Sequence, residues 1–158
     1  MIQIPSPNYN DRPDGMPINS IIIHYTGMET AQDALGRLCD PQSEVSAHYT
    51  IDMDGTIYNH VDPQNRAWHA GFSQLGDLTN FNDFSIGIEL VNKGHEFGYH
   101  AFPDAQIDAL VELMNDLFQK YPIDPELVLG HSDIAPNRKQ DPGELFPWER
   151  LITNNLKR

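Results

Sequence analysis

The sequence predicts a single α/β (α+β) domain in which a mixed central β-sheet is flanked by helices. Its length of 158 residues matches one domain and is long enough to bury a sizeable core. Short β-branched or alternating segments, typical of strands, recur along the chain. Two segments with apolar residues at helical spacing separate them, which gives the order β-α-β-β-β-α-β with a closing helix.

The chain begins with an arm that has no regular pattern. Residues 1–17 are rich in Pro, Asn and Asp, so we expect an irregular N-terminal arm followed by the main domain at 18–158. The β-branched run at 18–26 predicts a buried strand. Thr30 is a good N-cap for a short amphipathic helix, which Pro41 ends.

The middle of the chain contains a hairpin and a second buried strand. An Asp-Gly turn joins the predicted strands 47–52 and 56–61. Residues 72–84 are polar and read as a long surface loop. A strong strand is expected at 84–91, and the Gly- and Pro-containing segment 93–103 is expected to be another loop.

The last third of the chain contains the clearest helical pattern. Asp104 is expected to cap a helix over 105–120, whose apolar residues recur at helical spacing. A short strand at 127–130 and a loop at 132–145 follow. Residues 147–156 are predicted to form a closing helix.

The charge of the chain excludes several classes of partner. It has 10 Lys and Arg against 23 Asp and Glu, a formal net charge of −13. Nucleic acid needs a basic face, so it is excluded as the main partner.

No aliphatic run in the sequence approaches the ~20 residues of a membrane span. We expect a monomer without a transmembrane segment.

The single cysteine and the N-terminal residues bear on the compartment. Cys39 cannot form an intramolecular disulfide and is expected to be a small buried apolar residue, which fits a reducing compartment. The N-terminus lacks the basic and apolar regions of a signal peptide. These features favour the cytoplasm; a periplasmic or envelope location stays open if a signal segment precedes this numbering.

Two histidines and one aspartate form a candidate metal site. His24 ends one predicted strand, and His131 follows another. Asp141 comes ten residues after His131. Two imidazoles and one carboxylate are a ligand set for zinc that leaves a fourth position open, which is the catalytic arrangement.

Two further residues could act beside such a metal. Glu89 lies in a strand between two apolar residues, where it either faces solvent or acts as a general base in a poorly solvated cleft. Lys139 stands two residues before Asp141, so an extended chain places both side chains on one face. Glu89 and Lys139 could equally be solvated charged residues on the surface.

Five segments in order carry a resemblance to a known family. They are IIIHYT at 21–26, VSAHY at 45–49, RAWHAG at 66–71, NDFSIGIE at 82–89 and HSDIAPNRKQDPG at 131–143. The chain resembles the type 2 N-acetylmuramoyl-L-alanine amidases, the AmpD-like peptidoglycan amidases, from about residue 18 to 150. The resemblance implies the fold of amidases and peptidoglycan-recognition proteins.

The resemblance also implies a site. It implies one zinc ion (Zn2+) held by His24, His131 and Asp141. Glu89 matches the water-activating acid of the family, and Lys139 matches the lysine near the developing oxyanion. The substrate-binding residues it implies are Tyr49, Arg66 and His69.

The implied reaction is zinc-dependent hydrolysis of an amide in cell-wall recycling or turnover. The bond joins the lactyl group of N-acetylmuramic acid, in its ordinary or 1,6-anhydro form, to L-alanine of a muropeptide or peptidoglycan. A non-catalytic peptidoglycan-binding module is the alternative, which Asp141, Glu89 and Lys139 together disfavour. The commonest zinc peptidases are disfavoured because no His-Glu-x-x-His helix is present. His48 lies in a family motif and is expected to be structural.

Overall fold

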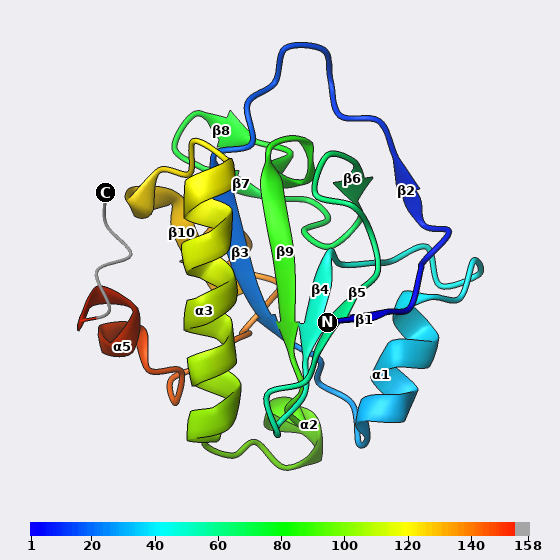
Figure 1. The fold of residues 1–158 in the computed structure, drawn as a ribbon, viewed down its shortest axis with the longest axis vertical. Helices are drawn as coiled ribbons and strands as arrows, with labels where there is room; N and C mark the ends of the chain where they lie inside the picture. Colours follow the sequence, from blue (N-terminus) through cyan, green and yellow to red (C-terminus); the bar gives the residue numbers. More distant parts are fainter. Residues whose placement is uncertain (154–158) are drawn as a thin grey trace.

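A six-stranded mixed sheet forms the centre of the molecule, as predicted (Figure 1). The computed structural model describes residues 1–153. The strand order is β1-β5-β4-β9-β3-β10; β10, β3, β9 and β4 run parallel, and β5 is antiparallel to β4. The strands are β1 (Ile2–Gln3), β3 (Ser20–Tyr25), β4 (Tyr49–Ile51), β5 (Ile57–Asn59), β9 (Ser85–Leu90) and β10 (Val128–Gly130).

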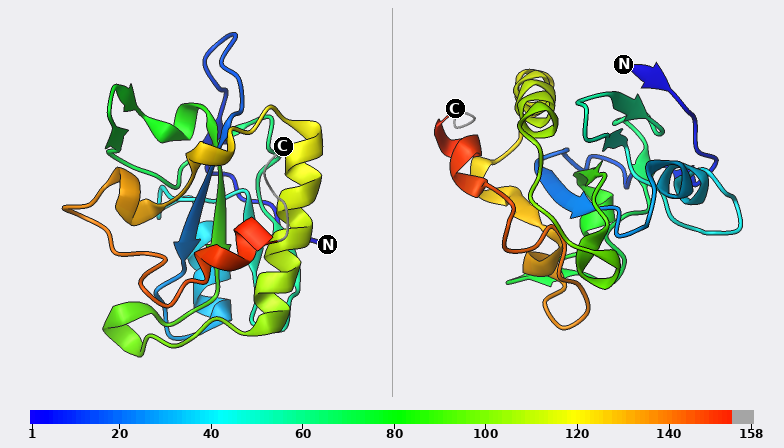
Figure 2. Two further views of the ribbon diagram at one scale, coloured as in Figure 1. Left: turned by 90° about the vertical axis from the view of Figure 1, so that its left-hand side faces the viewer. Right: turned by 90° about the horizontal axis from the view of Figure 1, so that it is seen from below.

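Helices lie on both sides of the sheet. The long helix α3 covers one face, and the segment directly after β10, which includes Ile134, packs on the opposite face (Figure 2, right). The chain then returns to the α3 side, where Leu151 packs in the main core. The helices are α1 (Ala31–Leu38), α2 (Gly94–Phe97), α3 (Asp104–Lys120), α4 (His131–Ile134) and α5 (Trp148–Thr153). Thr30 caps α1 as predicted, because its Oγ1 accepts a hydrogen bond from the backbone N–H of Asp33 at 3.0 Å. No helix within residues 1–153 is both long and apolar enough to cross a membrane.

Strand alternation divides the side chains of the sheet into two sets. Ile21 and Ile23 of β3 pack in the main core with the apolar face of α3, whereas Ile22 packs in a smaller core with Phe81 and Ile134. Successive side chains of a strand point to opposite faces. His24 therefore points to the face opposite α3, the face on which the candidate site lies.

Several segments contain more regular structure than the sequence predicts. The arm contributes β1 to the edge of the sheet, and β2 (Tyr9–Asn10) pairs with β6 (Arg66–Ala67). The loop at 72–84 holds a small hairpin and a 3-10 turn, formed by β7 (Gln74–Leu75), β8 (Leu78–Thr79) and η1 (Phe81–Asp83). Two-residue strands are specified by their tertiary partners, so local patterns miss them.

Some predicted loops and helix ends differ from the structure. The loops predicted at 93–103 and 132–145 include the four-residue helices α2 and α4. Asp104 is the first residue of α3, whose N-cap is Pro103, so Asp104 makes no cap. The closing helix is present as α5, and the part predicted beyond Thr153 lies outside the described residues.

Truncating the buried side chain of Met114 is expected to destabilise the fold by about 2–5 kcal/mol. Met114 is fully buried between α3 and the sheet, so Met114→Ala leaves a cavity. Urea unfolding monitored by circular dichroism measures the change in unfolding free energy. Asn115→Ala, on the exposed face of the same helix, is the matched control. Equal stability of the two variants would contradict this assignment of the core.

Candidate metal centre and catalytic cavity

A cavity of about 400 Å³ opens on the face of the sheet opposite α3. It lies at the C-terminal ends of the parallel strands β3 and β9, the position where open α/β sheets most often bind ligands. Its walls come from the end of β3, from α1, from α2 and from the chain after β10. His24, Glu89, His131, Lys139 and Asp141 all line it.

Three buried ligand atoms converge at the floor of this cavity. Nδ1 of His24 lies 3.0 Å from Nδ1 of His131 and 3.0 Å from Oδ2 of Asp141, and the third separation is 3.2 Å. Ligands around a tetrahedral zinc ion at its usual bond lengths lie roughly 3.3 Å apart. Because one proton can bridge only two of the three atoms, a cation satisfies the cluster best. These residues therefore fit a zinc ion with an open position.

The electrostatics of the cluster favour a charged carboxylate beside neutral imidazoles. Burial and the neighbouring His131 lower the pKa of His24 to about 4. Burial alone would raise the pKa of Asp141, but hydrogen bonds with His131 and His24 hold it below its ordinary value. Neutral imidazole and ionised carboxylate are the forms that bind a metal.

Glu89 lies beside the cluster on the neighbouring strand. His24 and Glu89 are partners in the parallel register of β3 and β9, so their side chains share one face. Oε2 of Glu89 is buried without a hydrogen-bond partner among the described residues. Burial, and then the charge of Asp141, raise the pKa of Glu89 well above its ordinary value, with Lys139 opposing. A carboxylate in this environment is more basic than that of an ordinary glutamate, which suits a group that accepts and returns a proton.

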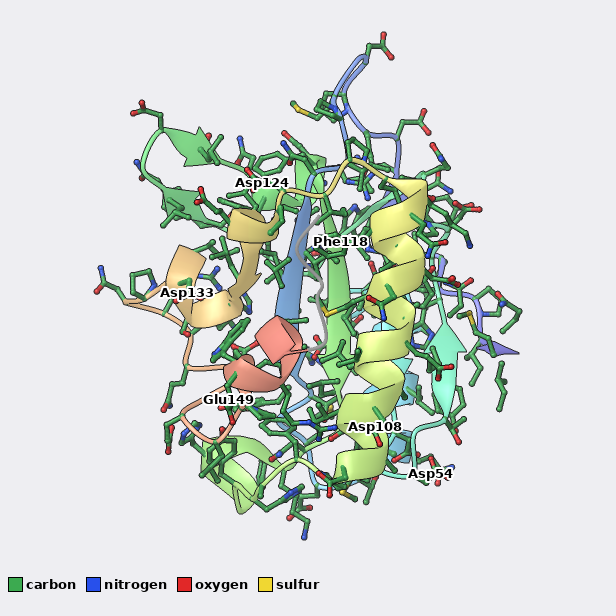
Figure 3. All side chains as sticks on the ribbon, turned by 60° about the vertical axis from the view of Figure 1, so that its left-hand side comes forward. Asp54, Asp108, Phe118, Asp124, Asp133 and Glu149 are labelled. Carbon is green, nitrogen blue, oxygen red and sulfur yellow. The ribbon has the colours of Figure 1, made fainter. Side chains whose placement is uncertain are left out.

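His131 and Lys139 are placed by the chain that follows β10. The backbone N–H of Gly130 donates to Oδ2 of Asp133 at 2.8 Å, which fixes the start of α4 at His131. Asp133 is labelled in Figure 3. The backbone N–H of Lys139 donates to the carbonyl of Ala135. This turn returns the chain to the cavity, where Lys139 stands on the exposed wall.

The structure separates the three predicted substrate-binding residues. His69 lines the cavity, with its ring beside His24; burial and then His24 lower the pKa of His69 well below its ordinary value. Arg66 does not line the cavity, and its Nε donates to Oδ1 of Asp83 at 2.7 Å. Tyr49 faces the α3 core and is 7% exposed, and burial raises its pKa to about 12. We therefore do not carry Tyr49 forward as a substrate-binding residue.

Two residues, one on the cavity wall and one behind it, have no role predicted from the sequence. His95 stands on the cavity wall between the hydroxyl of Tyr25 at 2.9 Å and the carboxylate of Glu144 at 3.0 Å. Oδ1 of Asn82 accepts from the backbone N–H groups of His69 and Ala70. Asn82 lies in NDFSIGIE, one of the five segments that carry the resemblance, whereas His95 lies in none of them.

The buried ring of His48 has a structural role, and its burial leads us to expect that the folded protein is less stable in acid. Its buried ring accepts from the N–H of Gly87 and donates to the carbonyl of Asn65. Burial, and then the charge of Arg12, lower the pKa of His48 to about 3. Below about pH 6.5 the imidazole of His48 is protonated in the unfolded chain but stays neutral in the folded protein. The contribution of His48 to the unfolding free energy is therefore complete above this pH and is lost progressively as the pH falls toward 3.

From pH 7 to pH 4.5 this histidine is expected to cost the protein roughly 2–3 kcal/mol of unfolding free energy. Urea unfolding across this range measures the slope. His48→Gln should show a shallower decline than the wild type, although its stability at pH 7 is lower. His100→Gln, on a loop, is the control. Identical slopes for His48→Gln and the wild type would refute the assignment.

Comparison with known proteins gives consistent matches. The family model described as N-acetylmuramoyl-L-alanine amidase matches residues 14–144. The chain is 37% identical to the 1,6-anhydro-N-acetylmuramyl-L-alanine amidase AmpD of Haemophilus influenzae, covering 96% of this chain and 90% of that protein. It is 42% identical to the N-acetylmuramoyl-L-alanine amidase AmiD of Escherichia coli, covering 88% of this chain but 54% of that protein.

Solved structures agree with the sequence matches. The crystal structure of a selenomethionine AmpD derivative superimposes with a TM-score of 0.86 at 34% identity, covering 97% of this chain and 93% of that one. AmiD from E. coli, in complex with the substrate anhydro-N-acetylmuramic acid-L-Ala-D-gamma-Glu-L-Lys, gives a TM-score of 0.81 at 38% identity. That match covers 94% of this chain and 62% of the other.

Proposed function

The chain belongs to the N-acetylmuramoyl-L-alanine amidase family, and from that premise we propose a zinc-dependent amidase that acts on soluble muropeptides. The reaction is hydrolysis of the amide between the lactyl group of N-acetylmuramic acid and L-alanine. The convergence of His24, His131 and Asp141 beside Glu89 carries the proposal. We assign the amidase domain to 18–158, of which 154–158 lie outside the described residues, preceded by the arm 1–17.

His24, His131 and Asp141 are the proposed zinc ligands. A zinc ion bound there supplies Lewis-acid polarisation of the scissile carbonyl and makes a water molecule more acidic. The ligand set has the composition of catalytic zinc sites, in which three protein groups leave a position for water or substrate. Asp141 contributes the negative charge that partly offsets the dication.

Glu89 is the proposed general base and then the general acid. It takes a proton from the attacking water as the carbon–oxygen bond forms, and it then passes this proton to the nitrogen of the departing alanine as the carbon–nitrogen bond breaks. Its unpartnered oxygen and raised pKa suit both steps. Lys139 stands on the same cavity wall, where its ammonium can offset negative charge developing on the carbonyl oxygen.

The charges around the cavity favour an anionic peptide substrate. Half of the Lys and Arg residues within 1–153 line the cavity: Arg37, Lys93, Arg138 and Lys139. Acidic side chains such as Asp54, Asp108, Asp124 and Glu149 instead stand on the outside of the molecule (Figure 3). Glu89, Glu96 and Asp141 also line the cavity, so it holds only a small excess of basic side chains, within a chain whose net charge is −13. This excess suits a small anionic muropeptide, whereas the net charge of the chain disfavours approach to a polyanionic wall.

These charges support a recycling role on 1,6-anhydro-muropeptides, as the name of the H. influenzae relative indicates for that protein. We propose cytoplasmic action in cell-wall recycling. The matches to named amidases disfavour a non-catalytic binding module.

Turnover on three substrates tests this function. Purified protein with one equivalent of zinc is given an anhydro-muropeptide, the matching reduced muropeptide and intact sacculi, and release of free stem peptide is quantified by mass spectrometry. Release from both soluble fragments with little from sacculi is expected. Efficient release from sacculi would refute a role confined to recycling, and no release from any of them would refute the amidase assignment.

A further inference from the structure

The segment His69–Ala70 lies directly behind both histidines of the proposed zinc site. Nε2 of His131 is 2.9 Å from the carbonyl oxygen of Ala70. Nε2 of His24 is 2.9 Å from Nδ1 of His69. Each histidine ligand therefore has a partner for the ring nitrogen that points away from the ligand cluster.

The partner of His131 determines its tautomer directly. A carbonyl oxygen only accepts hydrogen bonds, so Nε2 of His131 carries the proton and Nδ1 keeps its lone pair. His24 is different because its partner is another imidazole, which can donate or accept at either nitrogen. The direction of the hydrogen bond between His24 and His69 must therefore be set by a third group.

Ser85 supplies that direction. Its Oγ lies 2.5 Å from the carbonyl oxygen of Phe81, so the only hydroxyl proton is donated there. The same Oγ lies 3.0 Å from Nε2 of His69 and can only accept from it. Nε2 of His69 is then protonated, and Nδ1 of this neutral ring accepts the proton of Nε2 of His24. Nδ1 of His24 is left with a lone pair aimed at the ligand cluster.

The packing around His69 holds the ring in this orientation. Gly87 on β9 lies against the ring so closely that a Cβ at this position would overlap it. On the other side of the segment, Oδ1 of Asn82 accepts from the backbone N–H groups of His69 at 3.1 Å and Ala70 at 2.8 Å. His69 is 9% exposed, so solvent contributes little to its hydrogen bonding.

We propose that His69 is a positioning residue that, together with Ser85, fixes His24 in the tautomer able to bind zinc. The inference rests on the zinc site of the proposed function. In the other tautomer a proton stands on Nδ1 of His24, in the space that the metal needs, and must be displaced before binding. The hydrogen-bond chain from the Phe81 carbonyl through Ser85 and His69 removes this competition before zinc arrives.

Zinc affinity measured without substrate tests the proposal. The zinc dissociation constant is determined by competition with a chromophoric chelator. His69→Ala should weaken binding by about 10–100-fold, the usual effect of losing a partner of a metal-binding histidine. His69→Gln should restore most of the affinity, because its amide can accept from His24 and donate to Ser85. A purely structural role would not show this rescue.

Ser85→Ala provides a second variant if His69→Ala fails to fold. It removes the acceptor for Nε2 of His69 and should weaken zinc binding by about 10-fold. Ser20→Ala is the matched control: Ser20 is the partner of Ser85 on β3, is equally buried and donates to the carbonyl of Leu127, but no hydrogen bond joins it to a histidine in the described structure. It should bind zinc as the wild type does.

Nitrogen-15 NMR of the imidazole rings gives an independent readout in the zinc-loaded protein. The proton of His69 should be found on Nε2. A proton on Nδ1 would overturn the proposal, as would wild-type zinc affinity in His69→Ala, or in Ser85→Ala should His69→Ala not fold. Unchanged affinity with a raised KM would assign His69 to substrate binding instead. If the wild-type protein binds zinc with these dependences but releases no peptide, the proposed function fails while this inference stands.

Discussion

Replacing Glu89 with glutamine is expected to lower kcat by about 10²–10⁴-fold, the usual contribution of a general acid–base. Glutamine keeps the size of the side chain but cannot take a proton from water or return one to the leaving amine. Glu89 is not one of the three residues whose ligand atoms converge, so the zinc content of the variant should equal that of the wild type. Peptide release from an anhydro-muropeptide measures kcat, and atomic emission spectroscopy measures the metal.

A second carboxylate of the same cavity provides the control. Glu96 lines the cavity from α2 but lies in the exposed part of its wall. Glu96→Gln changes the net charge by the same amount and should retain kcat within a few-fold of the wild type. Wild-type turnover in Glu89→Gln with zinc bound would show that another group activates the water.

Substituting Asp141 with asparagine is expected to remove activity by removing the metal. The variant keeps the shape of the side chain but loses the anionic ligand that lies 3.0 Å and 3.2 Å from the two imidazole nitrogens. The affinity for zinc should fall by more than the 10–100-fold that follows loss of an outer partner. At one equivalent of zinc, peptide release should therefore approach the uncatalysed background.

Zinc titration separates this effect from a general loss of structure. The wild-type protein treated with a chelator should lose activity and regain it with one equivalent of zinc, whereas Asp141→Asn should not regain it. Asp83→Asn removes an aspartate that pairs with Arg66 away from the cavity and serves as the control. Full activity of metal-free wild-type protein would rule out the zinc mechanism.

The positions of His24 and Glu89 follow from the sequence because strand alternation is a local property. A buried strand ending in histidine, and a glutamate between Ile88 and Leu90, each show that the polar group faces the side opposite its apolar neighbours. Whether Glu89 meets solvent or a cleft on that side stays open in the sequence. The parallel pairing that places the two residues in register is not local. It depends on the crossover through α1 and the hairpin, which the sequence suggests only as an order of elements.

The environment of His69 shows what the sequence leaves undetermined. Its motif is visible, and the resemblance assigns it to the substrate groove, but a motif does not state which way a ring faces. The ring faces His24 because Gly87 has no side chain to occupy the space on β9, and because Oγ of Ser85 lies within hydrogen-bond distance of Nε2 of His69. Tyr49 shows the reverse case, because strand alternation turns its side chain toward the α3 core.

The register of β3 and β9 has a consequence for how this fold diversifies. The proposed zinc ligand His24 and the proposed general base Glu89 lie on strands joined by a ladder of backbone hydrogen bonds, whereas the cavity walls that carry Arg37 and Lys93 come from α1 and the segment beside α2. Inserted or substituted residues in those walls leave the pairing of β3 with β9 unchanged. Descendants of such a chain, or engineered chimeras, can therefore acquire new preferences for stem peptides without rebuilding the hydrolytic apparatus.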